Sequence, residues 1–193
     1  MYLRAGRHED AVKAFKKSLE LKPDQPACHY DLGLVAMRTS DLAEAEKQFR
    51  KSLELNPDDT RAIFNLGKVL RRSGQTALAE KVLTEFNRRQ DLQAQAKALE
   101  AAVRAHPEDL NSLYMLGETL LKLNKLDEGV GCYLKILAID PAHKKTLRTL
   151  VGMYLQLGYV HNAIETIRKA EAAAPDDEEI KAMKRQLEEA IKK

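Results

Sequence analysis

Five prolines recur along the chain at nearly constant spacing, and they constrain the fold more than any other feature. They are Pro23, Pro57, Pro107, Pro141 and Pro175, and their successive sequence numbers differ by 34, 50, 34 and 34. A fixed period of this size indicates a stacked array of one supersecondary unit. The second interval is longer than the period by 16, because 50 minus 34 is 16. The sequence therefore predicts an array with one 16-residue insertion.

The segment before each proline has the periodicity of an amphipathic helix. In residues 40–59, Leu42, Ala45, Phe49 and Leu53 fall on one stripe and charged residues face away. This helix ends at its Asn-Pro pair, because the residue before a proline is pushed out of the α region. A second helix, which precedes it, carries a small residue that lets two helices approach closely. The pairs are Leu32-Gly33, Leu66-Gly67 and Leu116-Gly117.

Between the two helices of each unit stand mostly residue types that tolerate the left-handed conformation ending a helix. They are Gly6, Ser40, Gly74, Asn124 and Gly158. With the Leu-Gly, Ala, aromatic and Pro positions, they make the chain resemble the tetratricopeptide repeat (TPR) family, whose unit is a 34-residue helix-turn-helix. The alternative is an unrelated helical bundle with chance proline spacing.

The resemblance implies an all-α fold, a right-handed α-solenoid of antiparallel helix pairs. Repeats are expected at 26–59, 60–91, 110–143 and 144–177, after a partial first repeat at 1–25 that holds mainly a second helix. Residues 178–193 are expected to form a capping helix, because a solenoid needs a polar-backed end. The incomplete first repeat suggests a fragment of a longer protein or an internal start, which leaves an upstream signal or anchor open.

The insertion falls within residues 76–105, a stretch without proline or glycine that is rich in strong helix formers. We expect one continuous helix there, about 45 Å long. The alternative is a break near Asp91, which could cap a new helix. In either case the regular superhelix is disturbed, and the array is expected to divide into two blocks.

Composition narrows the class of partner and the compartment. The net charge is +3, from 32 basic and 29 acidic residues, which does not indicate a nucleic-acid or membrane partner. No window approaches the apolar length of a membrane span. Cys28 and Cys132 are expected on different helices, far apart in the array, so a disulfide is not expected and a cytoplasmic location is favoured.

We find no sequence motif for catalysis. Nucleophile elbows, HExxH, phosphate-binding glycine loops and CxxC pairs are all missing, and the five histidines lack ligand-like spacing. The sequence therefore predicts a non-catalytic interaction scaffold without cofactor or metal. Two alternatives stay open: the substrate-recruiting arm of a larger enzyme, and self-assembly through Val12, Phe15 and Leu19, which the incomplete first repeat would expose.

The resemblance also implies a binding site, since the first helices of such repeats line a concave groove. The predicted peptide-binding residues are Tyr30, Arg38, Arg61, Phe64, Asn65, Lys68, Arg72, Tyr114 and Met115. Asn65, at the family's common groove position, is expected to bind a peptide backbone with both its carbonyl and its amide. Arg61, Lys68 and Arg72 recur on one face and suit carboxylates. Tyr30, Phe64, Tyr114 and Met115 would supply apolar contact area.

The expected partner is therefore a protein or peptide segment that carries acidic residues. The carboxylate clamp known from this family fits poorly, because Tyr30, Leu34, Asn111 and Met115 replace its lysine, asparagine and arginine positions and only Asn65 agrees. Nucleic acid is disfavoured too, because Phe64 is the single aromatic residue on the groove face of the basic segment.

Overall fold

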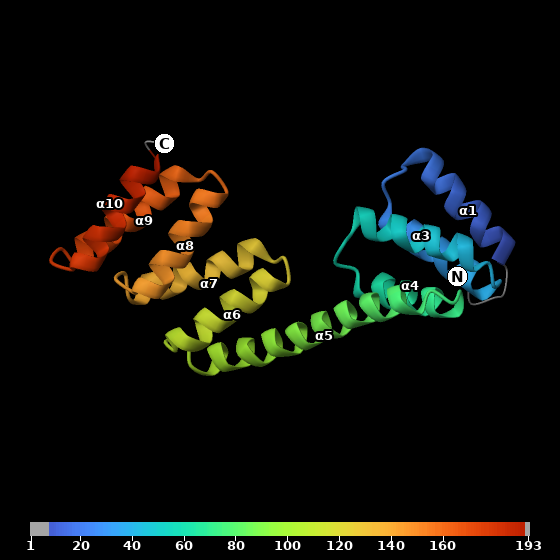
Figure 1. Ribbon diagram of the computed structural model, residues 1–193, viewed down its shortest axis with the longest axis horizontal. Helices are drawn as coiled ribbons and strands as arrows, with labels where there is room; N and C mark the ends of the chain where they lie inside the picture. The colour runs from blue at the N-terminus through green and yellow to red at the C-terminus, as the bar shows by residue number, and fades with distance from the viewer. Residues whose placement is uncertain (1–7, 192–193) are drawn as a thin grey trace. The chain divides into compact units, whose positions relative to one another are not determined.

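The chain is all-helical in the computed structural model, which describes residues 8–191. Within that range ten helices follow one another and no strand occurs (Figure 1). They are α1 (His8–Leu21), α2 (Pro26–Arg38), α3 (Leu42–Leu55), α4 (Thr60–Arg72), α5 (Thr76–Ala105), α6 (Leu110–Lys122), α7 (Leu126–Ile139), α8 (Lys144–Gln156), α9 (Val160–Ala173) and α10 (Glu178–Ile191). The predicted all-α fold of stacked helices is confirmed.

The long helix is confirmed as well, because α5 runs without interruption for 30 residues. The alternative break near Asp91 does not occur. The chain nevertheless divides into two compact units at that residue, Met1–Asp91 and Leu92–Lys193. Unit 1 holds α1 to α4 and the first half of α5, and unit 2 holds the rest.

The helices of the two units correspond at a constant offset in sequence number. α2 begins at Pro26 and α6 at Leu110, and 110 minus 26 is 84. The same difference separates the starts of α3 and α7, of α4 and α8, and of α5 and α9, as well as the ends of α1 and α5. The two units therefore share the same order of helices up to α5 and α9, unit 2 has α10 in addition, and residues whose numbers differ by this offset occupy equivalent places.

Capping and turn residues explain where these helices start and stop. Asp41 and Asp59 precede α3 and α4, and their carboxylates accept hydrogen bonds from the first-turn amides of Glu44 and Arg61, both at 3.0 Å. The predicted left-handed turn residues are confirmed within the described range. Positive φ values are found at Ser40 (63°), Gly74 (79°), Asn124 (61°) and Gly158 (77°). Gly6 lies outside that range.

The Leu-Gly pairs mark places where two helices touch. A Cβ built on Gly33 would lie 2.8 Å from the ring of Phe49, and one on Gly117 would lie 2.8 Å from the ring of Tyr133. Real Cβ atoms do not approach other atoms so closely. The glycines are therefore required by the fully buried aromatic rings that fill the core of each unit.

Apolar residues at helical spacing make a core in each unit. In unit 1, Phe49, Val69 and Leu70 are fully buried in one cluster. In unit 2, the cluster contains Tyr133, Ile136, Leu147, Leu150 and Ile167. Three α10 residues, Ile180, Met183 and Leu187, close the cluster from one side, while the charged residues of α10 remain at the surface. α10 thus caps the unit as expected, although residues 192 and 193 lie outside the described range.

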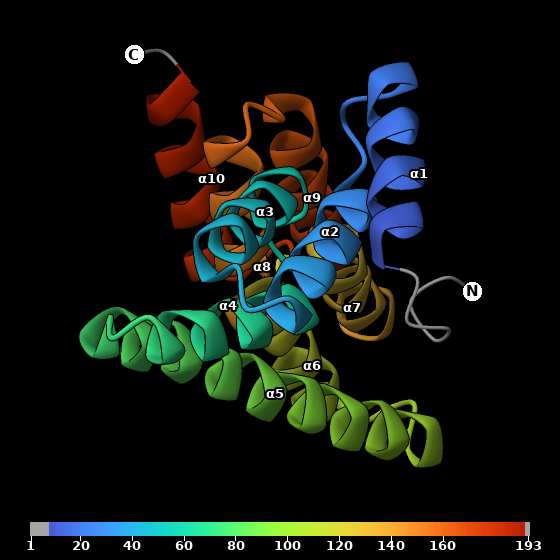
Figure 2. The ribbon, with the colours of Figure 1, turned by 90° about the vertical axis from the view of Figure 1, so that its right-hand side faces the viewer.

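Unit 1 begins with α1, whose inner face differs from the expectation. In Figure 2, α2 lies between α1 and α3. Ala11 is fully buried, and Val12, Phe15 and Leu19, which were expected to be exposed, are each half-buried.

Cys28 is half-buried and Cys132 is buried, and both are free thiols. Among the helices of residues 8–191, none has the length and apolar character needed to cross a membrane.

Candidate peptide-binding surface

Seven of the nine predicted binding residues lie on two neighbouring helices of unit 1. Tyr30 and Arg38 belong to α2, and the other five belong to α4. We call this surface the α2–α4 face; it consists of Tyr30, Asp31, Arg38, Arg61, Phe64, Asn65, Lys68, Arg71 and Arg72. Tyr114 and Met115 lie on α6 of unit 2 and are described separately.

Tyr30 and Asn65 join the two helices. The Asn65 Nδ2 donates a hydrogen bond of 3.1 Å to the Tyr30 hydroxyl. The Tyr30 ring packs against Phe49 with the ring centroids 5.8 Å apart, and burial raises the pKa of its hydroxyl. Asn65 was expected to offer both its amide and its carbonyl to a peptide. One of the two amide N–H groups is engaged by Tyr30, so the side-chain oxygen and the second N–H remain for a ligand.

Arg61 has a partner of its own. Its guanidinium donates two hydrogen bonds to the Asp59 carboxylate, at 3.0 and 2.8 Å, and lies 4.9 Å from the centroid of the Tyr30 ring. These hydrogen bonds hold the pKa of Asp59 below its usual range. Arg61 therefore neutralises Asp59 and packs on Tyr30, and its charge is less available to a ligand than the sequence suggested.

Lys68 and Arg72 differ from Arg61, because neither pairs with a carboxylate in the described part of the chain. The Lys68 Nζ lies 5.3 Å from the centroid of the Phe64 ring. Arg72 donates to the carbonyl of Met37 at 3.3 Å and more weakly to Ser40 Oγ at 3.5 Å, both at the end of α2. Both side chains are exposed. They supply the available positive charge of this face.

Phe64 is the exposed apolar residue beside them. It is 40% exposed and packs against Phe86 of α5, with the ring centroids 5.0 Å apart. In unit 1, therefore, an aromatic surface lies within reach of an ammonium group that has no carboxylate partner among the described residues.

Sequence reasoning did not include Arg71 among the binding residues. Leu34 and Met37 of α2 pack into the core that α2 shares with α4. α4 begins 34 residues after α2, and at that offset Leu34 and Met37 correspond to Lys68 and Arg71, both exposed. The side of α4 on which another helix would stack is therefore charged. Comparing equivalent positions of successive repeats could have revealed this change.

Tyr114 of unit 2 has surroundings similar to those of Tyr30 of unit 1. It is too buried to offer apolar contact area to a ligand. It is only 5% exposed, and its ring packs against Tyr133 at 5.3 Å. The Lys145 Nζ lies 3.7 Å from the ring centroid, and the Tyr114 hydroxyl hydrogen-bonds to Thr149 Oγ1 at 2.9 Å. Met115, next to it, is 39% exposed.

A metal centre finds no support in the described residues. Nowhere between residues 8 and 191 do three His, Cys, Asp or Glu side chains group in a way that could hold a metal ion. Burial raises the pKa of the Cys132 thiol, which suits a packing residue better than a nucleophile.

Solved structures with similar chains include TPR proteins. One is described as "Crystal structure of YrrB: a TPR protein with an unusual peptide-binding site"; it is 22% identical, with 95% of this chain and 87% of that chain covered and a TM-score of 0.41. MamA from Desulfovibrio magneticus RS-1 is 26% identical, with 91% and 92% covered and a TM-score of 0.41. A crystal structure of MamA is 20% identical, with 88% and 90% covered and a TM-score of 0.39. No curated protein sequence matches the chain.

Family models identify the chain more directly. Two models described as "Tetratricopeptide repeat" match residues 86–144 and 150–177. The model described as "Cilia and flagella-associated protein 70 middle TPR-like domain" matches residues 2–106, which is more than half of the 193 residues. The resemblance to TPR proteins is thereby confirmed, and the chain belongs to the TPR-like family that the cilia and flagella-associated protein 70 middle domain represents.

Proposed function

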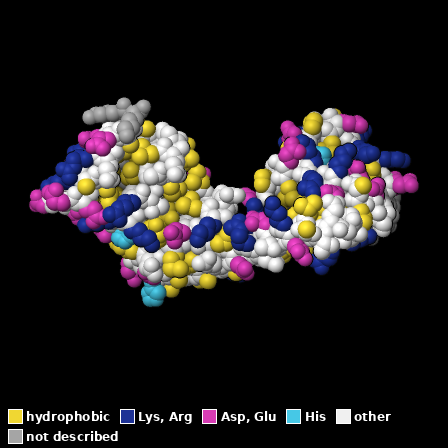
Figure 3. Space-filling model, viewed as in Figure 1, with side chains coloured by type: hydrophobic (Ala, Val, Ile, Leu, Met, Phe, Trp, Pro, Cys, Tyr) yellow, Lys and Arg dark blue, Asp and Glu magenta, His cyan; other side chains and the backbone are white. Residues whose placement is uncertain are grey.

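We propose that the chain is a non-catalytic scaffold for protein–protein interaction, and that the α2–α4 face binds a peptide segment containing acidic residues. The observation that carries this proposal is the pair Lys68 and Arg72, two exposed cations without a carboxylate partner in the described residues, together with the 40% exposed ring of Phe64. Over the right-hand unit in Figure 3, Lys and Arg side chains border hydrophobic ones.

The charges of the face favour an acidic ligand. Arg38, Lys68, Arg71 and Arg72 are exposed on α2 and α4, whereas the carboxylate of Asp59 is already paired with Arg61. Asp31, the one acidic residue of the face, is partly buried, so the exposed charged residues of the face are all basic. A ligand carboxylate would therefore meet a positive surface, and an arginine such as Arg72 can bind it in bidentate geometry.

The hydrogen bond between Asn65 and Tyr30 supports the proposal in another way. It fixes the Asn65 side chain in one orientation, with the side-chain oxygen left to accept a hydrogen bond from a peptide amide. A group held in place before binding loses less conformational entropy when the ligand arrives. The Phe64 ring would contribute apolar contact beside that hydrogen bond.

A comparison of two peptides tests the proposal. The peptides have equal length and the same apolar residues, and one carries Asp and Glu where the other carries Lys and Arg. In fluorescence anisotropy, the acidic peptide should bind more tightly, and its affinity should fall as the salt concentration rises.

The variant Lys68→Glu/Arg72→Glu should weaken binding of the acidic peptide roughly tenfold or more, because two attractions become repulsions. Lys17→Glu/Lys81→Glu changes the net charge equally at two exposed lysines of α1 and α5 and should leave the affinity unchanged. Equal losses in the two variants would show a general effect of net charge and contradict a site on the α2–α4 face.

A further inference from the structure

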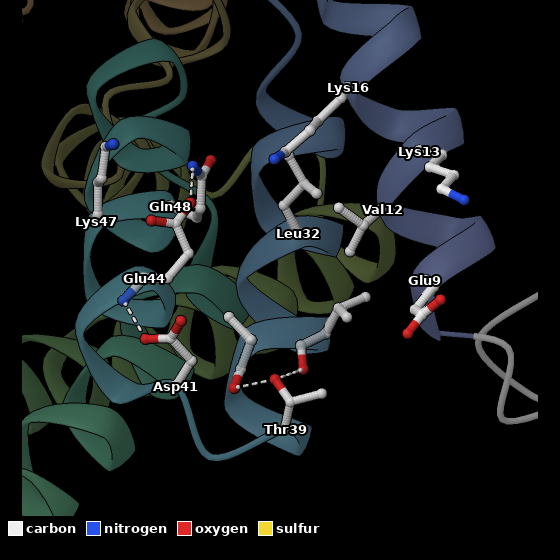
Figure 4. Close-up of a pocket in the computed structure, with 12 residues that line it drawn as sticks. Glu9, Val12, Lys13, Lys16, Leu32, Thr39, Asp41, Glu44, Lys47 and Gln48 are labelled. Carbon is white, nitrogen blue, oxygen red and sulfur yellow. Dashed lines mark hydrogen bonds between the residues drawn. The ribbon is translucent and has the colours of Figure 1, made fainter.

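A second surface of unit 1 is a hollow on the side where α1 and α3 flank α2. Its volume is about 870 Å³. The floor is apolar and consists of Val12, Leu32, Val35 and Ala36, and the rim is charged (Figure 4). We call it the α1–α3 groove. It does not include any residue of the α2–α4 face.

Three positions of the groove carry larger or less polar residues in unit 2. At the constant offset between the units, Ala36, Thr39 and Gln48 correspond to Leu120, Leu123 and Cys132. There, Leu120 and Cys132 are buried in one cluster, and Leu123 packs against it. At these three positions the hollow of unit 1 is therefore lined by smaller or more polar side chains than those that pack together in unit 2. The groove is therefore a feature of these particular side chains and does not follow from the fold alone.

The rim charges are divided between the two ends of the groove. Glu9, Asp41 and Glu44 lie near the starts of α1 and α3, whereas Lys16 and Lys47 lie farther along the same two helices (Figure 4). Lys13 joins the rim from α1. One end is consequently acidic and the other basic, and the apolar floor runs between them.

This pattern matches the usual charge distribution of a helix. Natural helices favour acidic residues in the first turn and basic residues in the last, because these charges interact well with the helix dipole. An amphipathic helix placed in a groove buries side chains at i, i+3, i+4 and i+7.

We propose that the α1–α3 groove binds an amphipathic α-helix of a partner protein. The acidic N-terminal turn of that helix would lie against Lys16 and Lys47, and its basic C-terminal turn against Glu9, Asp41 and Glu44. The bound helix would then run antiparallel to α1 and α3. This site is independent of the α2–α4 face, and the chain could hold two segments at once.

Two helical peptides of about 15 residues test the proposal. They are stapled, because free helices of this length are only marginally stable in water. Both carry Leu at i, i+3, i+4 and i+7. The first has Glu in its first turn and Lys in its last, and the second has the same composition with these charges exchanged. The wild-type chain should bind the first peptide roughly tenfold more tightly than the second. Absence of binding, or equal binding of the two, would overturn the proposal.

Two variants locate the site. Lys13→Glu/Lys16→Glu/Lys47→Glu should remove the preference for the first peptide, whereas Lys81→Glu/Lys97→Glu/Lys169→Glu, at exposed lysines elsewhere, should keep it. Ala36→Leu/Thr39→Leu/Gln48→Cys introduces the residues of unit 2 and should abolish binding of both peptides. Circular dichroism checks the fold of each variant. If Ala36→Leu/Thr39→Leu/Gln48→Cys, which we call the filled variant, does not fold, the result for the groove-lysine variant decides whether the peptide binds in the groove.

Further outcomes separate this inference from the proposed function and from self-association. Lys68→Glu/Arg72→Glu should leave binding of the stapled peptides unchanged; a tenfold loss would move their site to the α2–α4 face and overturn the inference. Light scattering of the wild-type chain provides the second check. Concentration-dependent association that the filled variant abolishes would assign the groove to a second copy of this chain instead.

Discussion

The hydroxyl of Tyr114 lies 2.9 Å from the Oγ1 of Thr149, and their hydrogen bond joins α6 to α8. The bond from Asn65 to Tyr30 joins α2 to α4 in the same way, at the equivalent positions of unit 1. In both units a cation, Arg61 or Lys145, lies over the tyrosine ring. A hydrogen bond between alternate helices therefore recurs at equivalent positions of the two units.

Loss of the Tyr30 hydroxyl should destabilise unit 1. Tyr30→Phe removes the acceptor of the Asn65 amide, which is half-buried, and should lower the free energy of unfolding by about 1 kcal/mol. Urea denaturation followed by circular dichroism measures the change. Tyr159→Phe, at a side chain that is 56% exposed, serves as the control and should have no effect. If both variants unfold alike, the hydrogen bond contributes nothing to stability.

The hydroxyl of Tyr133 should be dispensable. It is buried and has no hydrogen-bond partner in the described part of the chain, whereas its equivalent in unit 1 is Phe49. Tyr133→Phe should therefore be neutral or stabilise unit 2 by about 1 kcal/mol, because an unpaired buried hydroxyl is unfavourable. The reverse change, Phe49→Tyr, should destabilise unit 1 by about 1–3 kcal/mol. Thermal and urea unfolding measure the stability of both variants. Equal destabilisation of Tyr133→Phe and Phe49→Tyr would contradict this reasoning.

The helices could be predicted from the sequence, because local signals determine them. The prolines and Leu-Gly pairs recur with the period of the helices, and the helix formers of residues 76–105 give one continuous α5. The binding residues were harder to assign. The partners of Arg61 and of Asn65 are side chains whose contacts depend on the packed positions of helix ends and neighbouring helices.

Two features that were not predicted from the sequence, the burial of Tyr114 and the α1–α3 groove, can be found by comparing equivalent residues of the two units. Tyr114 was predicted to contact a ligand, but its burial follows from the stacking of Lys145 and Tyr133 on its ring. The α1–α3 groove was not predicted, because a hollow arises from small or polar side chains at positions where a larger apolar one would fit. Both features become visible when equivalent positions of the two units are compared, since Ala36 then stands opposite Leu120.

Substitution by alanine should have opposite effects on stability at a helical glycine that contacts a neighbouring helix and at one that faces open space. Gly33→Ala places a methyl group 2.8 Å from the Phe49 ring and should destabilise unit 1 by about 1–3 kcal/mol, which outweighs the better helix propensity of alanine. Gly152 lies within α8, and a Cβ there meets no described atom within 4 Å. Gly152→Ala should therefore stabilise unit 2 by about 0.5–1 kcal/mol. Urea unfolding measures both changes, and a stabilised Gly33→Ala variant would refute the close approach.

Acid should weaken an ion-pair network that connects α5 to the loop before α4. Glu85 accepts hydrogen bonds from Arg88 and Arg89, which lower the pKa of its carboxyl group to about 2, and Arg89 also pairs with Asp58 at 2.5 Å. Because the pKa of Glu85 is depressed below its unfolded value of 4.5, its stabilising effect is present above that pH and is lost as the pH falls toward about 2.

The network is partly exposed to solvent, so its effect should be small. Glu85→Gln should lower the free energy of unfolding at pH 7 by less than about 1 kcal/mol, and the difference from the wild-type chain should shrink at pH 3. The control is Glu80→Gln, at an exposed position earlier on α5 where the described residues provide no ion pair. It tests whether loss of any negative charge from this helix has the same consequence. Urea midpoints of the three proteins at both pH values decide the matter: a Glu85→Gln difference that persists undiminished at pH 3 would mean that ionisation of this carboxyl group does not stabilise unit 1.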